Sequence, residues 1–275
     1  MTTLTKRPEK VRTLGAVAVA GTDDWLAWRI AGHLVGLGLT VRHLGIGSSS
    51  LHRVDTLVLV PRLVPRSANA TRDVGLGPTG ITLGAATQGQ VDHVVLVSLV
   101  GADPKKPGHL GALGRLEAKV LARGSRVTII RATQVYGTAN DPGPFIERIH
   151  RTLSLASALG ALEIEPVFVG EVIEAVEEAV YRRLPAATFE VTGPRRVRVK
   201  TFAEQFDRHA HREPVTSSLI RLLHRSYMTH AARALGDLLE SQPVAIRRKV
   251  RFDFATNRED ALGKPRPVHD RIGVA

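Results

Sequence analysis

The chain has 275 residues, 43% of them hydrophobic, which is enough for a large core in one domain or in one domain with a smaller appendage. It contains no cysteine, and this excludes disulfides, cysteine metal sites and thiol catalysis. The formal net charge is +12, but the arginines are dispersed and Arg247–Arg251 is the one true cluster, so we do not expect a nucleic-acid partner.

No segment of the sequence predicts a membrane span or a secretion signal. No stretch approaches the roughly 20 uncharged apolar residues that a span requires. Residues 1–13 are polar and basic, with no apolar segment of the kind found in signal peptides. We therefore expect a cytoplasmic protein that does not enter membranes, beginning with a flexible tail over residues 1–13.

The ordered part of the chain opens with the pattern of a strand followed by a helix. Gly15–Ala20 is a continuous apolar run that ends at Gly21, as is typical of a strand covered on both faces. Asp23–Gly38 follows with helical spacing, and Gly38 is placed to cap its C-terminus. The apolar stripe of this helix is made of Leu26, Ile30, Leu34 and Leu37.

The alternation continues over the next hundred residues. Strands are predicted at 40–44, 55–60, 91–97 and 125–131, helices at 80–88 and 110–123, and loops at 61–79 and 101–108. Strands that alternate with helices predict an α/β protein, a Rossmann-type doubly wound parallel sheet with helices on both faces.

After Gly137 the pattern loosens. We predict helices at 144–159, 171–183, 201–209 and 217–239 and strands at 167–168 and 188–192. The predicted division is a Rossmann NAD(P)-binding-like domain at 14–206, with cleft elements from about residue 138, and a C-terminal helical lobe with a basic tail at 207–275. The amphipathic helix at 217–239 is expected to cover the cleft of the fold, with a dimer contact or an acidic partner as alternatives.

Five segments in the right order resemble one protein family over roughly residues 14–206. They are AVAVAGTDDWLA, VDHVVLVSLVGADP, RLEAKVLARGSRVTIIRATQVYG, EPVFVGEVIEAV and TFEVTGP. They are similar to the landmarks of atypical, extended-like short-chain dehydrogenases/reductases, close to the epimerase-like and NmrA-like NAD(P)-binding proteins. The resemblance implies a seven-stranded parallel sheet and a small C-terminal substrate lobe.

The resemblance also implies a dinucleotide loop after the first strand. The family places three glycines there, because the backbone approaches the pyrophosphate and the helix N-terminus supplies N–H groups. This chain has Gly21, Asp24 and Ala27 at the three positions. A carboxylate at position 24 repels a diphosphate, and Asp23 and Asp24 are typical of helix-capping residues. Two interpretations stay open: a lapsed cofactor site, or a retained site with unusual phosphate contacts.

If a cofactor binds, the end of the second strand favours NADP over NAD. The family uses an acidic residue there for NAD and a basic one for the 2′-phosphate of NADP, and this strand carries Arg42 and His43. An ordinary solvated arginine at position 42 is the alternative. The cofactor-binding residues would then be Gly21, Thr22, Asp24, Trp25, Leu26, Arg42, His43, Val60 and Pro61.

The catalytic Tyr-x-x-x-Lys pair of the family is missing. When the helix is counted back from Arg131, with Glu117 as the family's helix glutamate, the lysine position falls on Leu113 and the tyrosine position on His109. Ser98 and His109 remain as candidate acid/base residues, with His109 titrating as an ordinary histidine. The alternatives are a strand-end hydroxyl bonded to backbone and a capping histidine. No spacing of histidines or carboxylates predicts a metal site.

Two classes of function follow. The first is an NAD(P)-dependent oxidoreductase or epimerase-like enzyme, or a redox-neutral derivative that acts on a small molecule in the substrate cleft. The second is a non-catalytic protein: a catalytically lapsed scaffold or an NmrA-like regulatory protein that senses a nucleotide or binds a protein partner or a second copy of the chain, with or without a bound dinucleotide. Binding of an anionic partner such as nucleic acid, suggested only by the net charge, is a weaker alternative.

Overall fold

The computed structural model describes residues 15–21, 23–45, 51–65, 78–88, 91–124, 126–153, 160–183 and 186–209. Its main feature is a six-stranded parallel sheet in the order β2-β1-β3-β4-β5-β9. The six strands are β1 (Ala16–Gly21), β2 (Val41–Leu44), β3 (Val54–Val60), β4 (His93–Leu99), β5 (Arg126–Ala132) and β9 (Ala187–Val191). The predicted α/β, Rossmann-type fold is confirmed.

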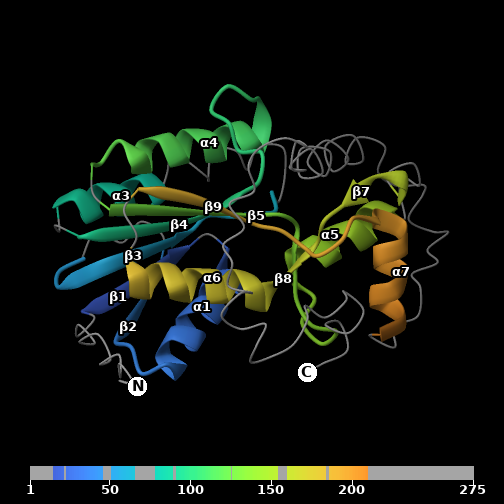
Figure 1. Ribbon diagram of the computed structural model, residues 1–275, viewed down its shortest axis with the longest axis horizontal. Coiled ribbons are helices and arrows are strands. Elements are labelled where there is room, and N and C mark those ends of the chain that lie inside the picture. The colour runs from blue at the N-terminus through green and yellow to red at the C-terminus, as the bar shows by residue number, and fades with distance from the viewer. Residues whose placement is uncertain are drawn as a thin grey trace, which may run out of the picture.

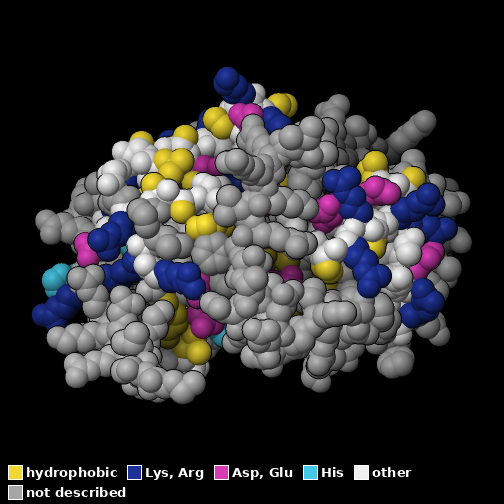
Figure 2. Space-filling model, viewed as in Figure 1, with side chains coloured by type: hydrophobic (Ala, Val, Ile, Leu, Met, Phe, Trp, Pro, Cys, Tyr) yellow, Lys and Arg dark blue, Asp and Glu magenta, His cyan; other side chains and the backbone are white. Residues whose placement is uncertain are grey.

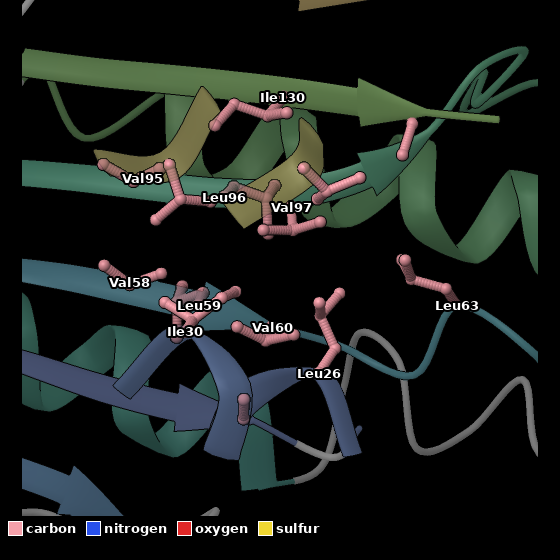
Figure 3. Packing of buried hydrophobic residues seen from close by; sticks show 14 of the residues in the cluster. Leu26, Ile30, Val58, Leu59, Val60, Leu63, Val95, Leu96, Val97 and Ile130 are labelled. Atoms are coloured by element: carbon pink, nitrogen blue, oxygen red, sulfur yellow. The ribbon is translucent and has the colours of Figure 1, made fainter. Parts of the chain in front are cut away.

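Helices cover both faces of this sheet (Figure 1). On one face α1 (Asp24–Gly36) contacts α6 (Val169–Arg182), and on the other lie α3 (Pro78–Gln88) and α4 (Gly108–Leu121). Because both faces are covered, β3 and β4 are apolar runs in which almost every side chain is buried. Figure 3 shows side chains of β3, β4 and β5 packing in layers, with Leu26 and Ile30 of α1 against them.

A smaller lobe, formed by segments before and after β9, lies beyond the carboxyl edge of the sheet (Figure 1). It contains α5 (Gly143–Leu153) and α7 (Val199–His209), which contact each other. Two pairs of two-residue strands accompany these helices: β7 (Glu163–Ile164) with β10 (Val197–Arg198), antiparallel, and β6 (Val135–Tyr136) with β8 (Val167–Phe168), parallel. This lobe is built from residues after β5, where cleft elements are expected from about residue 138. The C-terminal lobe predicted at 207–275 lies almost wholly outside the described residues and stays a prediction.

The expected seven-stranded sheet is wrong for the described residues, which contribute six strands. Only residues 45–53 connect β2 with β3, and β3 lies on the far side of β1 from β2. So short a connection leaves no room for a further strand with its own helix. The reversal of strand order beside β1 makes the β1/β3 boundary the switch point, where α/β sheets bind ligands outside their carboxyl ends.

Most predicted boundaries hold to within two residues. Gly38 has φ +83° directly after α1 and ends it as predicted. The helix predicted at 144–159 is described from Gly143 to Leu153, and residues 154–159 lie outside the described part. Three further predictions concern residues outside the described part: the tail at 1–13, the helix at 217–239 and nearly all of the C-terminal lobe at 207–275. They stay predictions.

The charge on the face drawn in Figure 2 is spread over the molecule, with Asp and Glu side chains between the Lys and Arg side chains. The described residues on that face therefore form no single basic patch (Figure 2). Among the described residues, every helix is too short or too polar to cross a membrane.

Candidate functional site

A pocket opens at the carboxyl ends of the central strands. It measures about 300 Å³ including its part open to solvent, the lower end of the roughly 300–1,000 Å³ typical of small-molecule sites. Its lining comes from the turns after β1, β3, β4 and β5 and from the start of α5: Asp23, Trp25, Leu26, Leu63, Val64, Leu99, Thr133, Gln134, Val135, Pro144 and Phe145. Leu26 and Leu63 lie at this end of the core in Figure 3. No Lys, Arg or His lines the pocket.

Gly21, at the end of β1, is required by packing. A Cβ there would lie 2.6 Å from the carbonyl oxygen of Val60 and 3.0 Å from the Cβ of Ala27. The close approach that the glycine permits is therefore the approach of β3 and α1 to β1. Val60 and Pro61 are both buried at this contact.

The amino end of α1 is capped by the protein itself. Asp23 is the N-cap residue, 6% exposed, and its Oδ1 accepts the N–H of Leu26 at 3.3 Å. Its own N–H donates to the carbonyl of Val60 at 3.3 Å. The capping role predicted for Asp23 is confirmed. Thr22 lies outside the described residues, and of Asp24 the structure describes the backbone as the first residue of α1.

Trp25 joins α1 to the loop that follows β5 and β6. Its indole N–H donates to Asp141 Oδ1 at 2.7 Å. Arg29, one helical turn further on, forms an ion pair with the same carboxylate, and its guanidinium carbon lies 4.3 Å from the centre of the Trp25 ring. Burial lowers the pKa of Arg29, and the charge of Asp23 partly offsets this. These contacts close one wall of the pocket.

The two basic residues of β2 are engaged elsewhere. Arg42 lies opposite Ala18, in the middle of the paired stretch, and its Nη1 donates to the carbonyl of His52 at 2.9 Å. The ring of His43 stacks on Trp28 of α1, with ring centres 4.0 Å apart and planes inclined by 18°. Neither residue lines the pocket.

His109 lies in the first turn of α4 and is 2% exposed. Its Nε2 is 3.1 Å from the carbonyl oxygen of Leu63, so Nε2 carries the proton and donates. Nδ1 is buried and has no hydrogen-bond partner. Burial lowers the pKa of His109 to about 4, although the backbone carbonyls of Leu63 and Arg62 act in the opposite direction. The expectation of an ordinary titration is therefore wrong, because the side chain is enclosed and not at a helix surface.

Ser98 is fully buried in β4, opposite Arg131 of β5. Its neighbour Leu99 lines the pocket and Ser98 does not, since successive strand residues face opposite sides of the sheet. The Oγ atom has no hydrogen-bond partner, so the predicted backbone bond of a strand-end hydroxyl is not found. Leu113, at the family's lysine position, is buried too.

The structure thus brings together only part of the predicted site. Trp25 and Leu26 line the pocket, whereas Ser98, His109, Arg42, His43, Val60 and Pro61 do not. Sequence reasoning missed Asp141 and Arg29, and it missed the pocket residues Thr133, Gln134 and Phe145. Thr133, Gln134 and Asp141 follow strands and Phe145 lies in the first turn of a helix, which is the one signal that marks them. Arg29, inside α1, has no such signal. Within the described ranges no group of three or more His, Asp or Glu side chains is placed to hold a metal ion.

The residues at the amino end of α1 do not fit a dinucleotide. A pyrophosphate requires free N–H groups and a positive helix end. Here the Leu26 N–H is bound by a buried carboxylate, and the lining of the pocket includes no cation.

We expect Gly21→Ala to lower the stability of the protein by about 1–3 kcal/mol, because the new methyl meets the Val60 carbonyl and must push β3 or α1 away. Urea denaturation measures the loss. Gly32→Ala in α1 is the matched control: its Cβ meets nothing within 4 Å, and alanine raises helix stability by about 0.5–1 kcal/mol. Equal stabilities of Gly21→Ala and the unmodified protein would show that this contact is not tight.

No protein-family model and no curated protein sequence matches the chain. Solved structures do match. UDP-glucose 4-epimerase of Thermotoga maritima, solved with UDP-glucose, is 14% identical, with 83% of this chain and 98% of that chain covered and a TM-score of 0.56. WbmH of Bordetella bronchiseptica, in complex with NAD+, is 15% identical, with 95% and 97% covered and a TM-score of 0.59. RMD of Pseudomonas aeruginosa, complexed with NADPH, is 13% identical, with 73% and 85% covered and a TM-score of 0.54. At these identities the likeness establishes a shared fold.

Proposed function

Since the chain has the fold of these solved structures, we propose that it is a catalytically lapsed relative of them, a binding or scaffold protein whose dinucleotide site no longer operates. The observation that carries the proposal is the buried Asp23 carboxylate at the amino end of α1, bonded to the Leu26 N–H. It stands where a nucleotide-binding member of this fold binds phosphate.

The charge of Asp23 makes this position unfavourable for an anion. Two like charges 4 Å apart repel by about 4 kcal/mol at an effective dielectric constant near 20. The lining of the pocket holds no Lys or Arg to offset that repulsion. Arg29, whose charge interacts with that of Asp23, is already paired with Asp141. A diphosphate would therefore approach a carboxylate with little compensation.

The positions that carry proton transfer in the family support the same proposal. His109 stands at the tyrosine position and is buried, with its pKa lowered to about 4, so it is a weak base at neutral pH. Leu113 stands at the lysine position and is buried as well. A protein of this kind would act through a protein partner or a second copy of the chain.

We expect no change in melting temperature when NADH or NADPH is added to millimolar concentration. A ligand that binds the folded state raises its stability by about 2.7 kcal/mol at 100 times its Kd, which a thermal-shift assay detects readily. A folded sample, verified by circular dichroism, is the control. A clear rise with either dinucleotide would overturn the lapsed-site proposal.

An NAD(P)-dependent oxidoreductase or epimerase-like enzyme is the second candidate. It is favoured by the position of the pocket at the carboxyl edge beside the β1/β3 switch point, and by neighbours solved with NAD+ or NADPH. The NADP preference expected from Arg42 and His43 would require both side chains to leave their present partners, His52 and Trp28. A larger thermal shift with NADPH than with NADH would support that preference. Ser98 and His109 would then be the residues to replace in an activity assay.

A further inference from the structure

The side chain of Trp25 is contacted at its edge by a carboxylate and on its face by a cation. Its N–H donates to the Asp141 carboxylate at 2.7 Å, and a hydrogen bond to a charged acceptor is about twice as strong as a neutral one. The Arg29 guanidinium lies over the ring at 4.3 Å and is fixed there by its own ion pair with Asp141. One carboxylate and one cation therefore recognise the edge and the face of the same indole.

Two glycines shape the remaining walls around the ring. A Cβ at Gly137 would lie 2.8 Å from the Trp25 ring, and a Cβ at Gly143 would lie 2.7 Å from it. Any larger residue at either place would collide with the indole. Gly143 also has φ +82°, a conformation that favours glycine, so the bend of the loop and the room for the ring depend on the same residue.

The loop that carries Gly137, Asp141 and Gly143 is held in shape by hydrogen bonds between its own backbone groups. The Gly137 N–H donates to the Pro142 carbonyl at 2.9 Å, and the Asp141 N–H donates to the Thr138 carbonyl at 3.1 Å. Neither bond involves Trp25. The site is therefore built by the loop and by Arg29, and the indole fills it.

We propose that Arg29, Gly137, Asp141 and Gly143 form a binding site for a planar aromatic heterocycle with a ring N–H donor, and that Trp25 occupies this site as an intramolecular ligand. A free ligand of the same chemistry enters when Trp25 is absent or displaced. This inference goes beyond the proposed function and does not depend on whether a dinucleotide binds, because none of the four residues caps α1.

The test is rescue of Trp25→Ala by indole, followed by circular dichroism at 222 nm during thermal unfolding. We expect Trp25→Ala to melt at a lower temperature and indole to restore part of the loss. Indene, which is close to indole in size and shape but has no N–H, should bind about three- to tenfold more weakly. The hydrogen bond to Asp141 is charged, but that side chain is 49% exposed and solvent weakens the interaction. The unmodified protein, whose site is filled, should show no shift with either compound.

The double variant Trp25→Ala/Asp141→Ala is the matched control, and there the preference for indole over indene should vanish. If Trp25→Ala is unfolded by itself, indole at millimolar concentration should restore its helical signal, because binding to the folded state shifts the folding equilibrium. The proposal is overturned if indole neither stabilises nor refolds Trp25→Ala, if indole and indene act equally on it, or if the unmodified protein responds to indole as the variant does.

Discussion

Replacement of Glu117 by alanine is expected to destabilise the protein by about 3–5 kcal/mol. Glu117 of α4 receives two hydrogen bonds from Arg131 of β5, from Nε at 3.1 Å and from Nη2 at 2.6 Å. The two side chains are only 5% and 19% exposed. Burial alone would lower the pKa of Arg131, but the hydrogen bond and charge of Glu117 outweigh it and raise the pKa. Removing the carboxylate leaves a buried, uncompensated cation, the costly case for an ion pair.

Urea denaturation at pH 7.5 measures this loss. Glu117→Gln keeps one acceptor oxygen and should lose less than Glu117→Ala. Glu204→Ala is the matched surface control, since Glu204 pairs with Lys200 at 3.8 Å in an exposed helical pair that contributes about 0.3–0.5 kcal/mol. A loss below 1 kcal/mol for Glu117→Ala would mean that Glu190 or Asp103, which also act on Arg131, replace the lost partner.

Acid should weaken the fold between pH 6.5 and pH 4. His93 of β4 is fully buried, and burial, with the charges of Arg183 and Arg126, lowers its pKa to about 4. His109 has a similar pKa, lowered by burial. Below pH 6.5 each histidine is protonated in the unfolded chain but stays neutral in the folded protein until the pH nears 4. The stability that these neutral histidines allow is therefore fully present above pH 6.5 and falls as the pH drops to 4. The loss is about 2 kcal/mol per histidine at pH 5 and about 3 kcal/mol at pH 4.

Urea midpoints at pH 7.5 and pH 5 measure this effect. The double variant His93→Gln/His109→Gln should lose most of the difference between the two midpoints. His52→Gln, at an exposed position, should leave it unchanged. If the unmodified protein has the same midpoint at both pH values, the two histidines are not held neutral by burial.

Much of the fold could be predicted because its strands are short apolar runs. Glycines end most of these runs, and segments with the apolar spacing of a helix separate them. Burial on both faces forces such runs into β1, β3 and β4, and the left-handed Gly38 ends α1 where the pattern indicates. The strands β6, β7 and β10 have two residues each, too few to show an alternation. The described residues give six strands in this sheet and not the expected seven. That expectation came from the resemblance, whereas only residues 45–53 connect β2 with β3.

The candidate site could be predicted only where a local rule applies. Capping by Asp23 could be predicted in this way, because the N-cap hydrogen bond joins residues only three positions apart. The hydrogen bond from Trp25 to Asp141 joins residues 116 positions apart, so no local pattern in the sequence predicts it. The depressed pKa of His109 also depends on tertiary packing, since burial beneath the Leu63 carbonyl is decided by how the turn after β3 meets α4.

The Asp23 carboxylate occupies the amino end of α1, and we propose that no phosphate group binds there. Calorimetric titration of NADPH into the unmodified protein and into Asp23→Asn tests it most directly, because asparagine keeps the cap and removes the charge. We predict no binding tighter than about 1 mM to the unmodified protein, and an affinity for Asp23→Asn that is equal or higher. A dissociation constant of about 10 μM or lower for the unmodified protein would contradict the claim.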